Sequence, residues 1–296
     1  MHFSKPNLSI DDQIAHLESK HLSIPDKHRA RRYLTNIGYY RLKAYAIPFY
    51  VPGTKTFVPE ISFDHVLNLY IFDRKLRVLL MDALDRIEIS VRCVISNVMS
   101  EHCGPHWFME AENFSPKFQT QNGKKLNGFQ QFHKEIERGT CKKRQNLRNP
   151  SCRHYYETYT RPEYPPSWII SETLTMGTWS KIFSGLRKTK YKKKISEHFG
   201  FDQKDFAAWI HALTLIRNIC AHHQRFWNRN LPPKATQVAA YTHEDIDLSK
   251  PPYCNIAMTY AFLCSITNAS AWNIRLSDLL EECPLDIHEH MGFPRD

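Results

Sequence analysis

FDHVLNLYIFDRKLRVLLMDALDRIEISVRCVISNVMS, the stretch from Phe63 to Ser100, contains neither glycine nor proline. Its apolar residues recur at intervals of three and four, which is the spacing of one face of an α-helix. They are Leu67, Tyr70, Ile71, Leu76, Leu79, Leu80, Leu84, Ile87, Val91, Val94, Ile95 and Val98. Gly104 and Pro105 then end the pattern. We therefore predict one very long helix, or two helices in line, as the central support of a helical bundle.

A second strong helix is predicted within DQKDFAAWIHALTLIRNICAHHQRFWNR, which runs from Asp202 to Arg229. Asp202 is a good N-cap residue, and Asp205 lies in the first turn, where the helix dipole favours a carboxylate. The core-facing stripe consists of Phe206, Trp209, Ile210, Leu213, Ile216 and Cys220. We expect this helix to continue to about Gln224. With only ten glycines in 296 residues and no alternating strand pattern, the chain is predicted to be all-α.

The same stretch carries polar residues that a helix does not need. His211, Asn218, His222, Arg225 and Arg229 would fall on one side if the helix continued that far. Arg217 instead lies near the edge of the apolar stripe, where a guanidinium must have a partner or a ligand. Three carboxylates interrupt the apolar pattern of the long helix, namely Asp82, Asp85 and Glu88. One of them, facing inward, would orient Arg217 towards a phosphate.

Arg217 and His222 have the spacing R-x4-H, but spacing alone is weak evidence. Arginine and histidine are common enough in this chain for about three R-x(4–6)-H matches by chance. Three are found: Arg217 with His222, Arg217 with His223, and Arg148 with His154. The first two differ from the third in context, because Arg217 is placed near the end of a long helix while Arg148 precedes a proline in a basic loop.

The formal net charge of +10 indicates an anionic partner. Nucleic acid, a membrane surface and an acidic protein all remain open on charge alone. The N-terminal residues lack the apolar segment of a signal peptide, and no stretch approaches the roughly 18 apolar residues of a membrane span. We expect a soluble cytoplasmic protein without a membrane partner.

The eight cysteines are scattered and form no C-x2-C pair. Neither a disulfide framework nor a zinc ribbon is therefore supported, and reduced, mostly buried thiols are expected. His102, Cys103 and His106 form the one tight group of soft ligands, but they straddle Gly104 and Pro105 without a second ligand pair. We predict no metal and no cofactor.

We divide the chain into three segments. Residues 1–60 form an N-terminal basic helical region packed on the core, with helices beginning at Ser9 and at about Asp26. Residues 61–230 form the bundle, with a mobile basic insertion at about 117–153 that holds at most one short helix near residues 129–137. Residues 231–296 form a C-terminal extension with helices at 254–272 and 273–280, packed on the bundle or on a partner chain.

Basic residues gather in two further places. In residues 27–45, lysine and arginine interleave with Tyr39, Tyr40 and Tyr45, which is compatible with nucleic-acid binding or with a solvated helix whose tyrosines pack inward. A second basic run precedes the Asp202 helix and contains Lys188, Lys190, Lys192, Lys193 and Lys194. Since no acid lies within that run, we expect it to steer a polyanion towards the candidate site.

Several stretches together resemble the Abi (abortive infection) proteins of the AbiD/AbiF type, which belong to the HEPN superfamily of helical ribonucleases. They occur in family order and cover roughly residues 30–285. The stretches are Ile37–Leu42 (IGYYRL), Tyr70–Arg92, Gly104–Trp107 (GPHW), Pro165–Leu186 and Arg217–Arg229 (RNICAHHQRFWNR). The resemblance implies a HEPN-type bundle with additional terminal helices and metal-independent RNA cleavage by a dimer. It also implies anti-phage abortive infection or a toxin–antitoxin pair, with RNA as substrate and a small RNA as a further candidate partner.

The resemblance implies roles for the site residues in transphosphorylation, in which the RNA 2′-hydroxyl attacks the adjacent phosphorus. His222 would relay protons, and Arg217 would hold the phosphoryl oxygens as charge builds in the transition state. Asn218, four residues before His222, could fix the imidazole. Residues expected to position phosphates are His223, Arg225, Asn228 and Arg229. Trp227 would either stack on a base or anchor the helix end.

One geometric difficulty bears on the oligomeric state. Residues five apart on an ideal helix point about 140° from each other and are about 7.5 Å apart along the axis. One helix therefore does not aim both Arg217 and His222 at one phosphate, and a homodimer with a composite cleft is expected. The alternatives are a catalytically inactive RNA-binding or protein-interaction module of the same fold and, ranked last, a DNA-binding protein, for which no helix-turn-helix pattern is seen.

Overall fold

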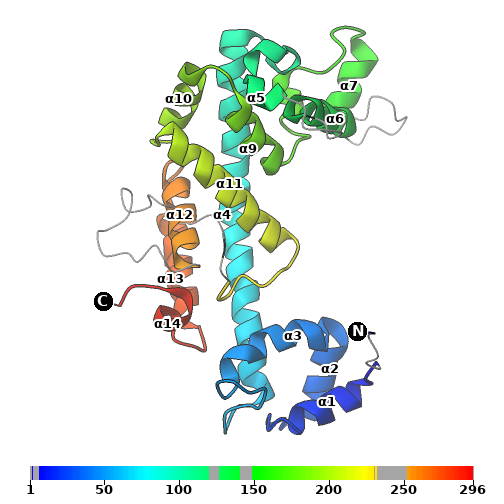
Figure 1. Cartoon of the computed structure of the whole chain (residues 1–296), viewed down its shortest axis with the longest axis vertical. Helices are drawn as coiled ribbons and strands as arrows, with labels where there is room; N and C mark the ends of the chain where they lie inside the picture. Colours follow the sequence, from blue (N-terminus) through cyan, green and yellow to red (C-terminus); the bar gives the residue numbers. More distant parts are fainter. Residues whose placement is uncertain are drawn as a thin grey trace.

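A computed structural model describes residues 2, 7–119, 127–140, 149–229, 231 and 252–295. Within these ranges the regular secondary structure consists of fourteen α-helices and three short 3-10 helices, without a strand. The all-α prediction is confirmed. Figure 1 shows the helices arranged around one that runs the length of the molecule.

The central helix is α4, Phe63–Cys103, with 41 residues. At 1.5 Å per residue it is about 60 Å long. Ser62 and His65 form a capping box at its start, and the Ser62 N–H lies 3.1 Å from His65 Nδ1. Gly104, with φ of +82°, ends it by donating its N–H to the Ser100 carbonyl. Of the two predicted possibilities, the single continuous helix is correct.

Three helices lie at the lower end of the view in Figure 1: α1 (Ile10–Glu18) packs on α2 (Lys27–Ile37), and α3 (Tyr39–Ala46) packs on α2 and on α4. The helix starts predicted at Ser9 and Asp26 are confirmed, since both side chains cap the first turn. A 3-10 turn, η1 (Ile47–Phe49), follows α3.

The basic residues of α2 are largely balanced by acids. Lys27 pairs with Glu18 at 2.8 Å, and Arg31 pairs with Asp11 at 2.5 Å. Tyr45 is buried, whereas Tyr40 is 85% exposed. Lys27 and Arg31 therefore fit the interpretation of a solvated helix. Tyr40 is exposed enough to stack on a nucleic-acid base.

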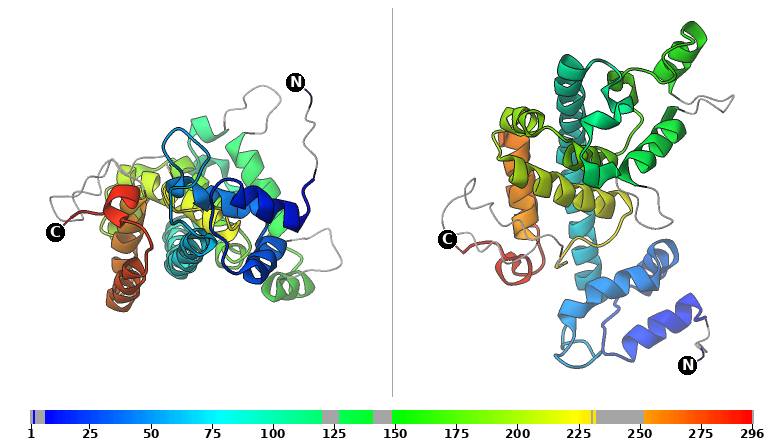
Figure 2. Two further views of the ribbon diagram at one scale, coloured as in Figure 1. Left: turned by 90° about the horizontal axis from the view of Figure 1, so that it is seen from below. Right: turned by 45° about the horizontal axis from the view of Figure 1, so that its top comes forward.

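α9 (Met176–Gly185), α10 (Thr189–His198) and α11 (Gln203–Ala221) also pack on α4, with α10 against its C-terminal end, where Lys194 pairs with Glu101. The right-hand view in Figure 2 shows α11 crossing in front of α4. Asp202 caps α11 by accepting a hydrogen bond from the Lys204 N–H at 2.7 Å, as predicted. α11 thus connects the upper helices to the middle of the long one.

Two C-terminal helices, α12 (Tyr253–Cys264) and α13 (Ser270–Glu281), pack on another side of α4, and the short α14 (Ile287–Met291) follows them. Trp272 Nε1 donates to the Leu79 carbonyl at 2.9 Å, and Arg275 pairs with Asp82 at 2.6 Å. The break predicted between residues 272 and 273 is wrong. The chain turns at 265–269, where the Asn268 side chain accepts the Ser270 N–H and starts α13.

The predicted insertion at 117–153 is partly a packed element. Its residues 120–126 and 141–148 lie outside the described ranges. α6 (Gly128–Thr140) occupies the place of the predicted short helix and buries Phe132 and Ile136, so this part is not the mobile segment we expected. Two helices that we did not predict overlap the ends of the segment, α5 (Pro116–Gln119) and α7 (Pro150–Thr158). The remaining short elements are η2 (Trp107–Met109), η3 (Ala111–Asn113) and α8 (Ser167–Ile170).

One hydrophobic core extends along the molecule and includes residues of all three predicted segments, such as Leu34, Leu213 and Leu276. The division into those segments stays a prediction. In the part of the chain that the structure describes, no helix is both long and apolar enough to cross a membrane.

Candidate functional site

The C-terminal end of α11 is a sharp turn built by two histidines. The helix ends at Ala221, and His222 is its C-cap. His223 has φ of +55° and donates its N–H to the Cys220 carbonyl, while the Gln224 N–H reaches the Ile219 carbonyl at 2.9 Å. This is a Schellman motif with histidine in the left-handed position that usually belongs to glycine. The helix is therefore shorter than predicted, and Arg225 and Arg229 do not continue its polar face.

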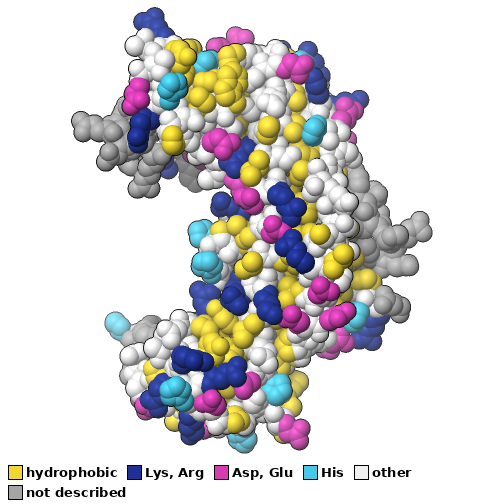
Figure 3. Space-filling model, turned by 180° about the vertical axis from the view of Figure 1, so that it is seen from behind, with side chains coloured by type: hydrophobic (Ala, Val, Ile, Leu, Met, Phe, Trp, Pro, Cys, Tyr) yellow, Lys and Arg dark blue, Asp and Glu magenta, His cyan; other side chains and the backbone are white. Residues whose placement is uncertain are grey.

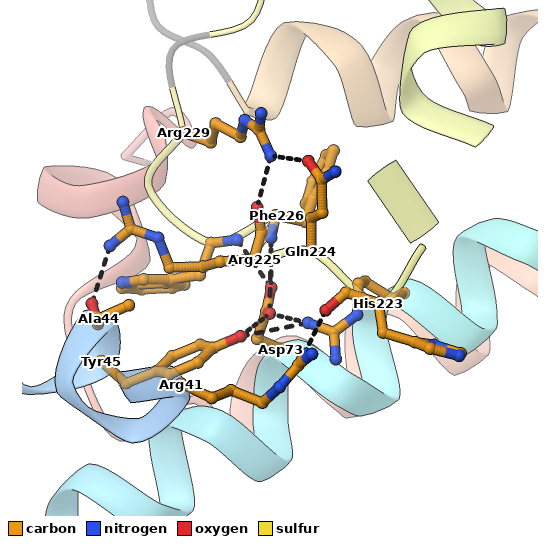
Figure 4. Close-up of polar contacts among 11 residues, drawn as sticks. Arg41, Ala44, Tyr45, Asp73, His223, Gln224, Arg225, Phe226 and Arg229 are labelled. Carbon is orange, nitrogen blue, oxygen red and sulfur yellow. Dashed lines mark hydrogen bonds and ion pairs between the residues drawn. The ribbon is translucent and has the colours of Figure 1, made fainter. Parts of the chain in front are cut away.

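A buried carboxylate holds the chain just after this turn (Figure 4). Asp73, on α4, has no exposed surface. It accepts hydrogen bonds from the Tyr45 hydroxyl at 2.6 Å, the Phe226 N–H at 3.1 Å and the Trp227 N–H at 2.7 Å, and it pairs with Arg77. Burial raises the pKa of Asp73, while Arg77 and the three other donors act in the opposite direction. Asp73 thus joins α3, α4 and the segment after α11.

Three arginines tie the turn to its neighbours (Figure 4). Arg41 on α3 donates from Nη1 to the His223 carbonyl. Arg225 donates to the Ala44 carbonyl at 2.9 Å, and Arg229 donates to the Gln224 side chain at 2.9 Å. Arg225 and Arg229 are predicted phosphate ligands, but each uses a guanidinium nitrogen to hold the protein. Asn228, also a predicted ligand, is exposed with φ of +43°.

Trp227 requires a correction as an RNA-binding residue. Its side chain is fully buried, and its ring packs edge-on against Phe72 with centroids 5.6 Å apart. An indole without exposed surface offers no face for a base. Of the two roles expected for Trp227, anchoring the end of the helix is the one that fits.

A groove of about 510 Å³ opens between α3 and the turn. It is lined by Ile37, Gly38, Tyr40, Arg41, Ala44, Tyr45, His222, His223, Gln224 and Arg225. His222 and His223 are exposed there. Figure 3 shows that this side of the molecule is hollowed, with histidine, lysine and arginine side chains gathered on the floor of the hollow. The groove therefore combines two imidazoles, two arginine side chains and an exposed aromatic ring.

Arg217 contacts α4, as we expected. Its Nε lies 3.3 Å from the Glu88 carboxylate, and the two side chains are 32% and 12% exposed. The contact is an ion pair rather than an aligned hydrogen bond, since Nε lacks a hydrogen-bond acceptor of good geometry. Arg217 does not line the groove beside His222. One chain thus brings His222 together with Arg41 and leaves Arg217 facing another helix.

The second basic run does not flank this groove. Lys194 pairs with Glu101 in the last turn of α4, at 2.9 Å, whereas Arg217 pairs with Glu88. Thirteen residues of helix, or about 20 Å, separate the two carboxylates. Lys192 donates to the Ser184 carbonyl, and partial burial lowers the pKa of its ammonium group. Lys193 pairs with Glu197. Lys188 and Lys190 lie over the ring of Tyr191.

No cysteine is among the described residues that line this groove. None of the seven described cysteines forms a disulfide, and burial raises the pKa of the Cys220 thiol to about 12. No group of three or more potential ligands that could hold a metal ion occurs among the described residues. His106, from the soft-ligand group considered above, lies 3.0 Å from the Tyr164 carbonyl.

Sequence reasoning missed Asp73, Tyr45 and Arg41 as parts of this site. Asp73 was a detectable signal, because it is a carboxylate within the apolar pattern of the long helix. Its partners are distant in the chain, however, and neither the composition nor the spacing identifies them.

A comparison with models of protein families finds a match to the Abi-like protein family over residues 32–228. The chain belongs to this family, which connects it with abortive infection. The matched region begins in α2 and ends in the turn after α11, so it includes both walls of the groove. Searches of curated proteins and of solved structures found no match.

Proposed function

We propose that this protein is a HEPN endoribonuclease of the AbiD/AbiF type that cleaves RNA without a metal. The observation that carries the proposal is the arrangement at the end of α11. An exposed His222 lies in a groove with Arg41, and Arg217, five residues earlier, is oriented by Glu88. Family membership supports a role in abortive infection.

The proposed reaction is attack of the RNA 2′-hydroxyl on the adjacent phosphorus, with departure of the 5′-oxygen and formation of a 2′,3′-cyclic phosphate. His222 accepts the 2′-hydroxyl proton. The resulting His222 imidazolium then supplies a proton to the leaving oxygen. Arg217 stabilises the charge that builds on the phosphoryl oxygens. Asn218 is exposed on the last turns of α11, where its amide can orient the imidazole.

We propose that the active site is completed by a second copy of the chain. Within one chain Arg217 faces Glu88 and His222 faces the groove, so they do not converge on one phosphate. Pairing two α11 ends across a dimer would place Arg217 of one copy beside His222 of the other. The homodimer, a cytoplasmic location and a small RNA antitoxin belong to this proposal.

A second candidate function is RNA or protein binding without cleavage. The structural roles of Arg217, Arg225 and Arg229 favour it, because each of these side chains has a partner within the fold. In that case His222 contacts a phosphate or a partner protein but transfers no proton.

RNA cleavage in EDTA tests the proposed function. The purified protein is incubated with a mixed RNA pool, and the product ends are analysed. New ends that carry 2′,3′-cyclic phosphate are expected from the wild-type protein and not from His222→Ala. His154→Ala is the matched control, since His154 is exposed on α7 and completes the chance match with Arg148. Bound but intact RNA would support the second candidate.

A further inference from the structure

A second polar groove, of about 430 Å³, lies between α5, α9 and α11. Its basic side chains are Lys117, Lys181 and His211, and its hydroxyl side chains are Ser115, Ser180 and Ser184. None of its described lining residues is acidic. The ammonium group of Lys192, which donates to the Ser184 carbonyl at 2.8 Å, adds another cation at its border. Ammonium, imidazole and hydroxyl groups donate hydrogen bonds, which phosphate oxygens accept.

Close packing forms the wall of this groove. A Cβ atom added to Gly185 would lie 2.6 Å from the Phe118 ring, so the ring rests directly on the backbone of α9. The Ser115 N–H donates to the Gly185 carbonyl at 2.8 Å, which fixes the start of α5 on the same helix. The groove is therefore part of the packed fold, while Lys117, Lys181 and His211 remain exposed.

The second groove is aligned with the first along α11. His211 lines the second groove and His222 lines the first. At 100° per residue, His211, Asn218 and His222 fall within about 40° of one another, on one face of the helix. All three are exposed. His211 and His222 are about 16 Å apart along the axis, at 1.5 Å per residue.

We propose that the groove of Lys117, Lys181 and His211 binds a backbone phosphate of the RNA strand whose cleaved phosphate lies at His222. The strand then runs along the exposed face of α11, and this assignment rests on the proposed function. At about 3.4 Å per stacked nucleotide, a 16 Å separation corresponds to about five nucleotides. Phosphate contacts of this kind set the position of the strand without reading its sequence.

Binding of single-stranded RNA of graded length, from three to twelve nucleotides, tests this inference. The His222→Ala protein is used, so that cleavage does not change the ligand, and Lys117→Gln and Lys181→Gln are added together. For strands long enough to reach both grooves, affinity should fall about 10-fold, and the salt dependence should weaken by about 1.4 in the slope for two lost contacts to a single strand. For three-nucleotide strands the affinity should not change. Lys55→Gln with Lys75→Gln, two exposed lysines outside both grooves, is the charge-matched control.

The outcomes separate this inference from the proposed function. Unchanged affinity at every length overturns the second groove as a phosphate site, and so does an equal loss at every length. Neither result depends on cleavage, which is measured separately in the wild-type protein. If the wild-type protein leaves RNA intact while the length-dependent loss is seen, the nuclease assignment fails and the second groove remains a phosphate-binding site.

Discussion

Arg217 and Glu88 form an ion pair across the contact between α11 and α4, with Nε 3.3 Å from the carboxylate oxygen. The carboxylate is the more buried partner, at 12% exposure. Loss of the guanidinium would therefore leave a largely buried carboxylate without a cation. This relationship means that Arg217 serves the fold even if it also contacts RNA, and the two roles must be separated by experiment.

Arg217→Ala should lower the free energy of unfolding by about 1–2 kcal/mol, because it leaves the Glu88 carboxylate without its cation. Adding Glu88→Gln should recover much of that loss by removing the unpaired charge. RNA cleavage should stay absent in both variants if the guanidinium stabilises the transition state. Urea denaturation and the cleavage assay measure the two properties. Cleavage restored in the double variant would restrict Arg217 to a structural role.

His222→Ala should reduce the cleavage rate by about 100-fold or more, with little change in RNA affinity, as expected for loss of a general acid–base group. His223→Ala should have a smaller effect, since His223 contributes its backbone carbonyl to Arg41. Single-turnover cleavage and binding measured on the same RNA distinguish rate from affinity. Full activity of His222→Ala would leave the groove as a binding surface.

Mixing two inactive proteins tests the composite site. When Arg217→Ala and His222→Ala chains exchange subunits, mixed dimers regain one site with both residues intact. Activity should then reappear in the mixture although each variant alone is inactive. A mixture that remains inactive after verified subunit exchange contradicts a site shared between chains.

The left-handed turn at His223 makes a separate prediction about stability. His223→Gly and His223→Ala both remove the imidazole, but only glycine adopts φ of +55° without a steric penalty. The glycine variant should therefore be more stable than the alanine variant by about 1 kcal/mol. Thermal unfolding of the two variants measures the difference. Equal stability would mean that the turn relaxes away from its left-handed conformation.

Acid should destabilise the protein partly through His133 on α6. Burial lowers the pKa of His133 below its ordinary 6.5, although Glu137, Glu163 and the Phe108 carbonyl, 3.1 Å away, oppose the shift. As pH falls through about 6.5, the unfolded chain takes up a proton that the folded chain does not, so the free energy of unfolding decreases. Between pH 7.5 and 5.5 this decrease should be smaller in His133→Gln. Parallel pH profiles for the two proteins would contradict the assignment.

The sequence is informative where the determining interactions are local. The periodicity of residues 63–100 predicts α4, and the caps at Ser9, Asp26 and Asp202 are recognised because each bonds to an amide two or three residues away. Glu88 was predictable as a partner for Arg217 because both residues are charges on helical faces that are otherwise apolar. These signals depend on neighbours in the chain or on one helical face.

The remainder of the site depends on distant contacts. α11 ends early because His223 adopts a left-handed backbone conformation, which residue propensities do not predict. The burial of Trp227 results from packing on Phe72, and the placement of the basic run far from the groove results from how α10 lies on α4. A linear pattern contains none of this geometry. Sequence patterns therefore predict the polar cluster at this helix end but not which of its side chains are held within the fold.

The Asp73 carboxylate also sets when the groove can exist during synthesis. Its hydroxyl donor, Tyr45, lies 28 positions before it, but the amide of Trp227 lies 154 positions after it. A nascent chain that has emerged only through α4 holds this carboxylate without the amides that complete its shell. The wall of the groove that carries His222 and His223 is docked only after α11 and the following residues leave the ribosome. An unfinished chain thus lacks the assembled groove.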